Sequence, residues 1–142
     1  MEQSKKVKYW INIAEEDFSL ATYLFAGEKF LYTGFMCHQA VEKSLKAVIA
    51  RNCGDDEIPP KIHNLLVLAD KAQIYTKISE NQKVFISQLN PLNIEARYPE
   101  YKDEIAKTLS NQICKQIITE TEELLCWIKK LLSDTPADMP MK

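Results

Sequence analysis

Apolar residues recur every three or four positions over three long stretches of this chain, which is the spacing of an amphipathic helix. The pattern predicts helices over residues 4–26, 30–52 and 102–132. Each helix has an apolar stripe that needs a partner, so we expect the three to pack together. The stripes are Val7, Ile11, Ala14, Phe18, Ala21 and Phe25, then Phe35, His38, Val41, Leu45, Val48 and Ile49, and last Ile105, Leu109, Ile113, Ile117, Leu124, Ile128 and Leu131.

The ends of the first two helices carry residues that are typical of helix boundaries. Ser4 is the expected N-cap of the first helix. Gly27 and Gly54 are expected to close the first and second helices, because glycine adopts the left-handed conformation at low cost. Gly34, near the start of the second helix, leaves room for a close neighbour.

Shorter elements are predicted between the long helices. One helix begins near residue 61, after a pair of prolines, and fades around residue 75. Ser79 and Gln82 form the pattern of a capping box that opens another short helix. Residues 93–101 are predicted to form a loop, and residues 133–142, which contain two prolines, a flexible tail.

The predicted fold is all-α, an antiparallel up-and-down bundle of four to five helices. No stretch alternates apolar and polar residues for long enough to indicate a strand. A chain of 142 residues, 46% of them hydrophobic, has the size and composition of one domain with its own core. We assign that domain to residues 1–132.

The charge balance argues against a protein whose whole surface attracts nucleic acid. Eighteen basic and twenty acidic residues give a net charge of −2, although a local basic groove stays compatible with that total. The basic N-terminus is followed by polar residues rather than by an apolar run, so we expect neither a signal peptide nor a membrane span. We therefore expect a cytoplasmic protein.

Metal and cofactor motifs are missing from the sequence. No two of the four cysteines form a Cys-x-x-Cys pair, and the two histidines do not complete a zinc pattern. We therefore expect reduced, non-catalytic thiols. No glycine-rich phosphate loop occurs. The sequence therefore predicts no metal site and no cofactor. The cysteines are Cys37, Cys53, Cys114 and Cys126.

The second predicted helix carries a cluster of polar residues that an ordinary structural helix does not need. His38, Glu42 and Lys46 follow one another at intervals of four, and Gln39 lies three positions before Glu42. Residues at these intervals occupy neighbouring strips of a helix surface. Lys43 adds a further cation beside them. This cluster is the first candidate for a functional site.

Residues 37–47, which include this cluster, resemble the signature helix of the HEPN (higher eukaryotes and prokaryotes nucleotide-binding) domain family, in its prokaryotic stand-alone form. Residues 17–21, 62–65 and 95–99 are similar to further family segments, in the same order. The resemblance implies a helical bundle, often a homodimer, with a link to nucleotides or RNA. It also implies a small nucleotidyltransferase partner in a two-gene, toxin–antitoxin-like module, with this chain as the accessory protein.

A nucleotide-binding role is then expected for seven residues. The lysines and the arginine would meet phosphates, the tyrosine would stack on a base, and the histidine and glutamine would contact polar edges. The glutamate would hold a cation in place. These residues are His38, Gln39, Glu42, Lys43, Lys46, Arg97 and Tyr98.

Two other functions stay open. Many family members are metal-independent ribonucleases with an arginine, four to six residues and then a histidine. Here no arginine precedes His38, and eleven residues separate Arg51 from His63, so a nuclease would need a non-standard pair of His63 and Arg97. The third possibility is a structural dimerisation module with the polar cluster at its interface.

Simpler structural roles also stay open for the same residues. His38 could be a hydrogen-bonded interior histidine, and Glu42 with Lys46 an ordinary exposed ion pair. His63 could start the third helix, and residues 97–99 could form a structural corner.

Overall fold

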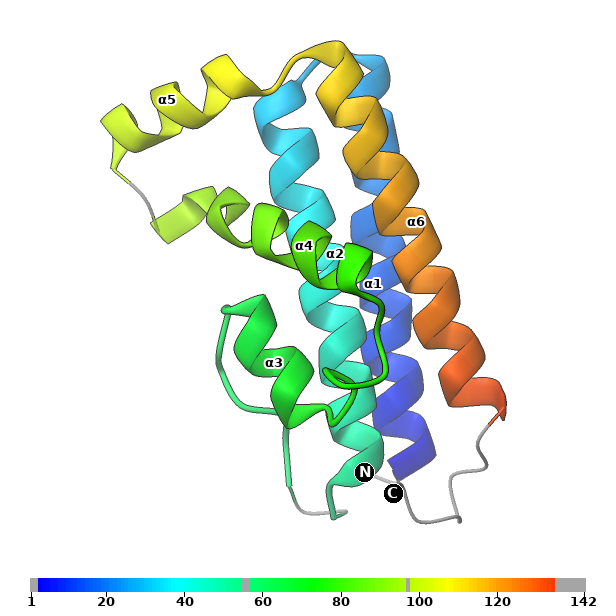
Figure 1. Cartoon of the computed structure of the whole chain (residues 1–142). Coiled ribbons are helices and arrows are strands. Elements are labelled where there is room, and N and C mark those ends of the chain that lie inside the picture. Colours follow the sequence, from blue (N-terminus) through cyan, green and yellow to red (C-terminus); the bar gives the residue numbers. More distant parts are fainter. Residues whose placement is uncertain (1–2, 55–56, 97, 135–142) are drawn as a thin grey trace.

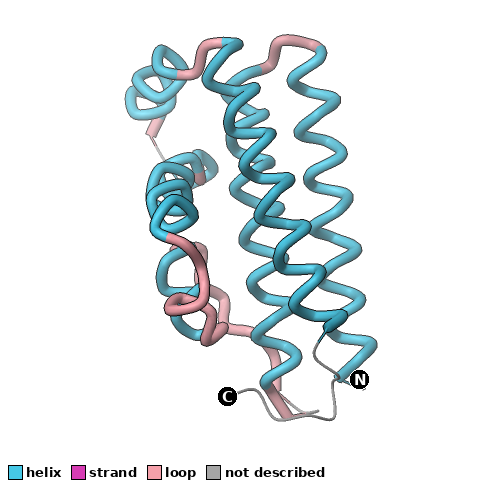
Figure 2. Tube along the Cα trace, turned by 45° about the vertical axis from the view of Figure 1, so that its right-hand side comes forward, coloured by secondary structure: helices cyan, strands magenta, loops and turns pink. Residues whose placement is uncertain are grey.

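Within the residues that the computed structural model describes, 3–54, 57–96 and 98–134, there are six α-helices and no strand. The long helices are α1 (Gln3–Ala26), α2 (Phe30–Asn52) and α6 (Asn111–Asp134), which stand side by side in Figures 1 and 2. The all-α class is therefore confirmed. The shorter elements are α3 (Leu65–Lys71), α4 (Glu80–Leu89), the 3-10 turns η1 (Asn90–Leu92) and η2 (Ile94–Ala96), and α5 (Pro99–Thr108).

The first two long helices have the predicted up-and-down order, whereas the third does not alternate with the second, and the described residues form six α-helices rather than four to five. Helix α1 runs antiparallel to α2 and α6 (Figure 1). Helices α2 and α6 run parallel to each other, since Cys114 Sγ near the start of α6 contacts the Phe30 carbonyl, and Arg51 near the end of α2 donates to the Leu131 carbonyl. The chain returns between them through α3, α4 and α5, which cover one side of the long helices (Figure 1).

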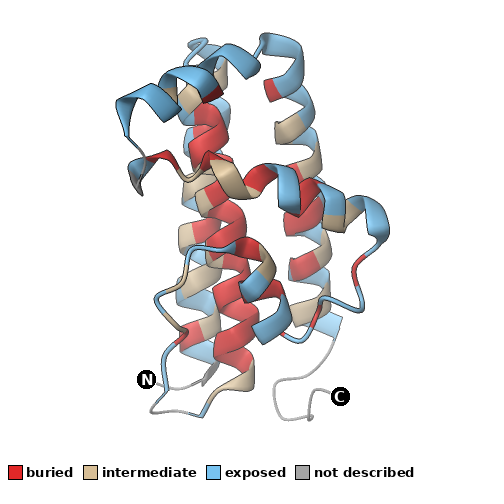
Figure 3. Cartoon of the chain, turned by 60° about the vertical axis from the view of Figure 1, so that its left-hand side comes forward, coloured by how far each residue is buried: buried red, intermediate tan, exposed pale blue. Residues whose placement is uncertain are grey.

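Helix α2 is the centre of the molecule, and most of its length is buried, as Figure 3 shows in red. Helices α1 and α6 and the short helices α3 and α4 pack around it. Burial of each large apolar side chain contributes about 1.5–3 kcal/mol to folding. The largest fully buried side chains of the core include Val41, Leu45, Leu65, Leu68, Ile74, Ile86, Leu89, Ile94, Leu124 and Ile128.

Helix α1 has nearly the predicted bounds, but the capping roles expected of Ser4 and Gly27 are wrong. Helix α1 begins at Gln3, so Ser4 lies inside it rather than capping it. Gly27 does not adopt the left-handed conformation, which falls instead on Glu28 with a φ of 60°. The Lys29 amide then donates to the Leu24 carbonyl at 2.9 Å, which closes the helix end.

Helix α2 has the predicted bounds but a different ending. The residue after its last turn, Cys53, has an extended conformation and forms the C-cap. Gly54 has no positive φ. The prediction for Gly34 is confirmed, because an added Cβ there would lie 3.1 Å from Leu92 Cδ1 and 3.3 Å from Leu109 Cδ1. The absent side chain thus lets η1 and the end of α5 pack closely on α2.

The single helix predicted over residues 102–132 is wrong, because the structure has α5 and α6 there with a break between them. Leu109 leaves the helical conformation with a ψ of 81° and is buried beside Gly34. The Ser110 hydroxyl accepts a hydrogen bond from the Ile113 amide and so caps α6. Helix α5 in turn begins inside the predicted loop of residues 93–101.

The remaining short elements agree better with the sequence. The capping box of Ser79 and Gln82 is present at the start of α4. Helix α3 begins at Leu65 with Asn64 as its N-cap, four residues later than expected. Residues 135–142 lie outside the described residues, so the flexible tail stays a prediction. None of the described helices combines the length and the apolar character that crossing a lipid bilayer requires.

Candidate functional site

The carboxylate of Glu42 is the centre of a polar network inside the bundle. Its side chain is 1% exposed. Lys46, one turn later on α2, donates from Nζ to Glu42 Oε2 at 3.0 Å. His63, in the segment before α3, lies with Nδ1 3.0 Å from Glu42 Oε1. The Lys46 ammonium also lies 5.7 Å from the ring centre of Trp10, within the range of a cation–π contact.

These contacts determine the protonation of Glu42 and the orientation of His63. Burial raises the pKa of Glu42, but the hydrogen bonds from Lys46 and His63 outweigh it, and the pKa lies below the usual value. Glu42 is therefore an ionised acceptor at neutral pH. Because a carboxylate only accepts hydrogen bonds, His63 donates from Nδ1 to Glu42 Oε1.

His38 lies behind this pair and is fully buried. Burial lowers its pKa to about 4, although the charge of Glu42 opposes the shift, so the ring is neutral at pH 7. Its Nδ1 accepts from Gln39 Nε2 at 3.4 Å and lies 3.9 Å from Glu42 Oε1, too far for a hydrogen bond. Among the described residues its Nε2 has no hydrogen-bond partner.

The network continues towards the surface between α1 and α2. Lys43 donates from Nζ to Gln39 Oε1 at 3.0 Å and lies 3.6 Å from Asp17 Oδ2 on α1. Partial burial raises the pKa of Asp17, an effect that Lys43 opposes. We call this set the α2 polar network. It comprises Asp17, His38, Gln39, Glu42, Lys43, Lys46 and His63.

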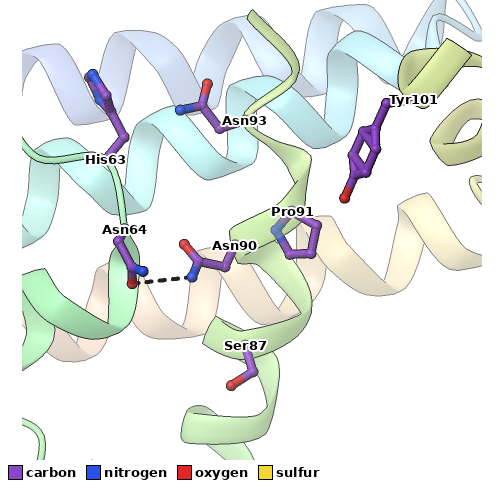
Figure 4. A pocket seen from close by; sticks show the side chains of 7 residues that line it. All are labelled: His63, Asn64, Ser87, Asn90, Pro91, Asn93 and Tyr101. Atoms are coloured by element: carbon purple, nitrogen blue, oxygen red, sulfur yellow. Dashed lines mark hydrogen bonds between the residues drawn. The ribbon is translucent and has the colours of Figure 1, made fainter. Parts of the chain in front are cut away.

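A pocket of about 360 Å³ opens on the outer side of His63. Its walls come from the segment before α3, the end of α4, η1 and α5 (Figure 4). The His63 side chain is 60% exposed, so one face of the network reaches solvent there. The residues that line this His63 pocket are His63, Asn64, Ser87, Asn90, Pro91, Asn93 and Tyr101.

Two asparagines of the pocket are held by backbone amides. Asn64 Oδ1 caps α3 by accepting from the amides of Leu66 at 3.0 Å and Val67 at 3.2 Å. Asn90 Oδ1 accepts from the Leu65 amide at 2.8 Å. Asn90 Nδ2 donates to Asn64 Oδ1 at 3.2 Å, the dashed line in Figure 4. Both carboxamides are therefore fixed in orientation.

With this geometry in view, comparison with known proteins decides the family. The profile of the HEPN domain family matches residues 7–131. The chain belongs to the HEPN domain family. This membership supports an association with nucleotides or RNA in general terms, and HEPN domains often dimerise.

A solved structure has the same fold as this HEPN domain. The crystal structure of TT1696 from Thermus thermophilus is similar with a TM-score of 0.73, over 89% of this chain and 98% of that one. The two sequences are 16% identical, so the likeness concerns the fold alone. No match was found among curated proteins.

The HEPN domain brings most of the expected site residues together. Gln39 and Lys43 lie at the edge of the network, whereas three expected residues, His38, Glu42 and Lys46, lie inside it. The alternative of an exposed ion pair is therefore wrong for Glu42 and Lys46. His38 is an interior histidine.

The two remaining expected residues and His63 stand apart from that group. Tyr98 is 82% exposed and does not line the pocket, which Tyr101 lines instead, one turn into α5. Arg97 lies outside the described residues. His63 does not start α3, because the N-cap is Asn64.

Sequence reasoning misses six of the seven residues that line the pocket in this HEPN domain, all except His63. They are Asn64, Ser87, Asn90, Pro91, Asn93 and Tyr101. The available signal is weak. Asparagine before a proline marks the end of a helix, and Asn90 stands at such a place. Nothing in the spacing indicates that this helix end meets the start of α3.

The thiols of the HEPN domain are not activated. Burial raises the pKa of Cys37 to about 12 and that of Cys114 to about 11, so both are neutral at pH 7. Cys37, Cys114 and Cys126 are free cysteines. Over the described part of the chain, no three His, Cys, Asp or Glu side chains gather in a way that could hold a metal ion.

Proposed function

We propose that this HEPN domain binds a nucleotide, or an unpaired segment of RNA, in the His63 pocket. One observation carries the proposal. The buried carboxylate of Glu42 holds the exposed imidazole of His63 at the rim of a polar pocket. Burying a charged group costs free energy. A buried, ionised carboxylate that orients an exposed histidine is therefore typical of a functional site.

The expected residues take different parts in this proposal. Glu42 and Lys46 act from the interior as positioning residues for His63. Lys43, with its side chain 19% exposed, and Arg97, which lies outside the described residues, are proposed to meet phosphates. Tyr98, which is exposed, is proposed to stack on a neighbouring base. Gln39 and His38 are proposed to keep the neighbouring side chains of the network in position.

Titration of the labelled full chain with nucleoside monophosphates and short RNA tests the proposal. We expect amide signals around residues 63–64 and 90–93 to move, and His63→Ala to weaken binding about tenfold or more. Lys129→Ala, on the exposed face of α6, is the control and should bind normally. If neither nucleotides nor RNA move any of these signals, the proposal is wrong.

A second candidate function is metal-independent cleavage of RNA. Glu42 accepts from His63 Nδ1, so His63 Nε2 is the ring atom proposed to act as the general base for a ribose hydroxyl. A cation for the phosphorane is also required, and Arg97 is the proposed source. RNA cleavage in the presence of a chelator, lost in both His63→Ala and Arg97→Ala, would establish this activity. Binding without cleavage would favour the accessory role.

We also propose the partners that the family resemblance implies. These are a second copy of the chain and a small nucleotidyltransferase from a two-gene, toxin–antitoxin-like module, with a cytoplasmic location. Light scattering tests the homodimer. Co-purification with the product of a neighbouring gene tests the nucleotidyltransferase partner. Three members of the polar network, His38, Glu42 and Lys46, are already buried within one chain, so they do not require a dimer interface to cover them.

A further inference from the structure

We infer that the His63 pocket recognises the base of a nucleotide rather than its phosphate, through an edge with two neighbouring hydrogen-bond acceptors, such as O6 and N7 of guanine. This inference rests on the proposed function, since it specifies the ligand of the same pocket. The observation behind it is the locked orientation of Asn64 and Asn90 (Figure 4).

The hydrogen bonds of the two carboxamides decide which atoms are left for a ligand. Both oxygens accept backbone amides of α3, at Leu65, Leu66 and Val67. Rotating either carboxamide by 180° would turn its NH2 group against those amides, so the orientation is settled by chemistry. Asn90 Nδ2 gives one of its two hydrogens to Asn64 Oδ1 and keeps the other. Asn64 Nδ2 keeps both, within the described residues.

On the side formed by Asn64 and Asn90 the pocket consequently offers donors, and these donors are neutral. Its lining contains no lysine, arginine or carboxylate among the described residues. A phosphate site depends on charge-assisted hydrogen bonds from such cations. The first amides of α3 are not available to an anion either, because Asn64 and Asn90 already cap them. The electrostatics thus favour an uncharged, acceptor-bearing ligand.

The remaining lining residues suit a flat ring. Tyr101 and Pro91 present apolar rings on the side of the pocket away from His63 (Figure 4), and aromatic side chains stack on the faces of bases. Asn93 and His63 add further polar side chains to the lining of the pocket. The volume of about 360 Å³ lies within the range of roughly 300–1,000 Å³ for small-molecule sites.

Two adjacent donors distinguish the purines. Guanine presents O6 and N7, both acceptors, on one edge, whereas adenine presents N7 beside an amino group. If the amino group of adenine lay against Asn64 or Asn90, its N–H donors would face the Nδ2 donors of the asparagine, and neither would have an acceptor. We therefore expect guanosine monophosphate to bind about tenfold tighter than adenosine monophosphate. This ratio is typical of the discrimination that one bidentate contact to a base provides.

A titration of the full chain with three probes tests this inference. The probes are guanosine monophosphate, adenosine monophosphate and inorganic phosphate, and the readout is the side-chain amide signals of Asn64 and Asn90. We expect the guanine nucleotide to move both NH2 signals at about a tenfold lower concentration than the adenine nucleotide. Inorganic phosphate should leave them unchanged.

A matched pair of variants at Asn64 sharpens the test. Asn64→Asp keeps an oxygen for the α3 cap but replaces the donor by an acceptor, so the guanine-to-adenine ratio should fall to about one or reverse. Its added charge affects both nucleotides alike and cancels in the ratio. Asn64→Ser keeps a neutral cap without the carboxamide and should also lose the preference.

The possible results separate the two proposals. Equal affinities for the two nucleotides, with signals moving at the pocket, would overturn base recognition while leaving nucleotide binding intact. Signal changes caused by inorganic phosphate alone would overturn it as well. No response to any nucleotide or RNA would overturn both proposals.

Discussion

The α2 polar network and the His63 pocket are both polar, and His63 connects them. They differ in the charge of their polar groups and in how many of those groups are already hydrogen-bonded. In the network the charged groups of Glu42 and Lys46 are buried and bonded to each other. In the pocket the groups are neutral and partly unused, as at Asn64 and Asn93. The difference indicates that the network specifies structure, whereas the pocket is available to a ligand. His63 belongs to both.

The largest effect that would test this contrast is expected from Glu42→Ala. The substitution leaves Lys46 buried without its partner and releases His63, and removing one member of a buried ion pair costs about 3–5 kcal/mol. Urea denaturation measures the loss. Glu15→Ala is the matched control, because Glu15 pairs with Lys129 on the surface and should contribute less than about 1 kcal/mol. Equal losses in the two variants would contradict the contrast.

The second effect concerns acid and His38. In the folded chain its pKa is about 4, against 6.5 as the ordinary value, so the unfolded chain binds more protons between these limits. Stability is therefore complete above pH 6.5 and falls as the pH drops towards 4. The total loss from this group is about 3 kcal/mol, at 1.36 kcal/mol for each unit of pKa.

Denaturation midpoints at pH 7, 6, 5 and 4.5 measure this loss. The variant His38→Gln should show a flatter dependence over the same range, whatever its stability at pH 7. Glu42 contributes in a different window, since its pKa is lowered and its stabilisation is lost only below the ordinary value of 4.5. An unchanged slope in His38→Gln would show that another group causes the acid sensitivity.

The two regions also differ in how far the sequence predicts them. The network lies mostly on one helix, and the interval of four between His38, Glu42 and Lys46 is enough to predict that they meet. Helix α2 itself is predictable to the residue, because its apolar stripe is continuous between Gly27 and Gly54, although neither glycine adopts the left-handed conformation. Local patterns suffice wherever both partners belong to one helix.

The pocket could not be predicted in the same way, since it combines three segments that are distant in sequence. Asn64 meets Asn90 only because α3 and α4 pack together, and neither residue carries a periodic pattern. The break at Leu109 escapes prediction for a related reason. Its cause is the space beside Gly34, which is a tertiary feature, although Ser110 offers a local capping signal.

A smaller effect is expected where the pocket does contribute to structure. Asn64→Ala removes the N-cap of α3 and the acceptor for Asn90, which should cost about 1 kcal/mol. Asn64→Ser keeps a hydroxyl oxygen at the cap and should stay within about 0.5 kcal/mol of the natural chain. Thermal unfolding of the two variants measures the difference. If both lost the same stability, the cap would not be the stabilising contact.

The smallest effect on stability is expected from Asn93→Ala. The Asn93 side chain lines the pocket, makes no hydrogen bond within the described residues and lies outside the helices. Substitutions at such places change stability by less than about 0.5 kcal/mol. Binding of nucleotides should nevertheless weaken, because a polar group of the rim is lost. Asn12→Ala on the exposed face of α1 is the matched control, with neither effect. A marked loss of stability in Asn93→Ala would mean that the pocket, like the network, serves the fold.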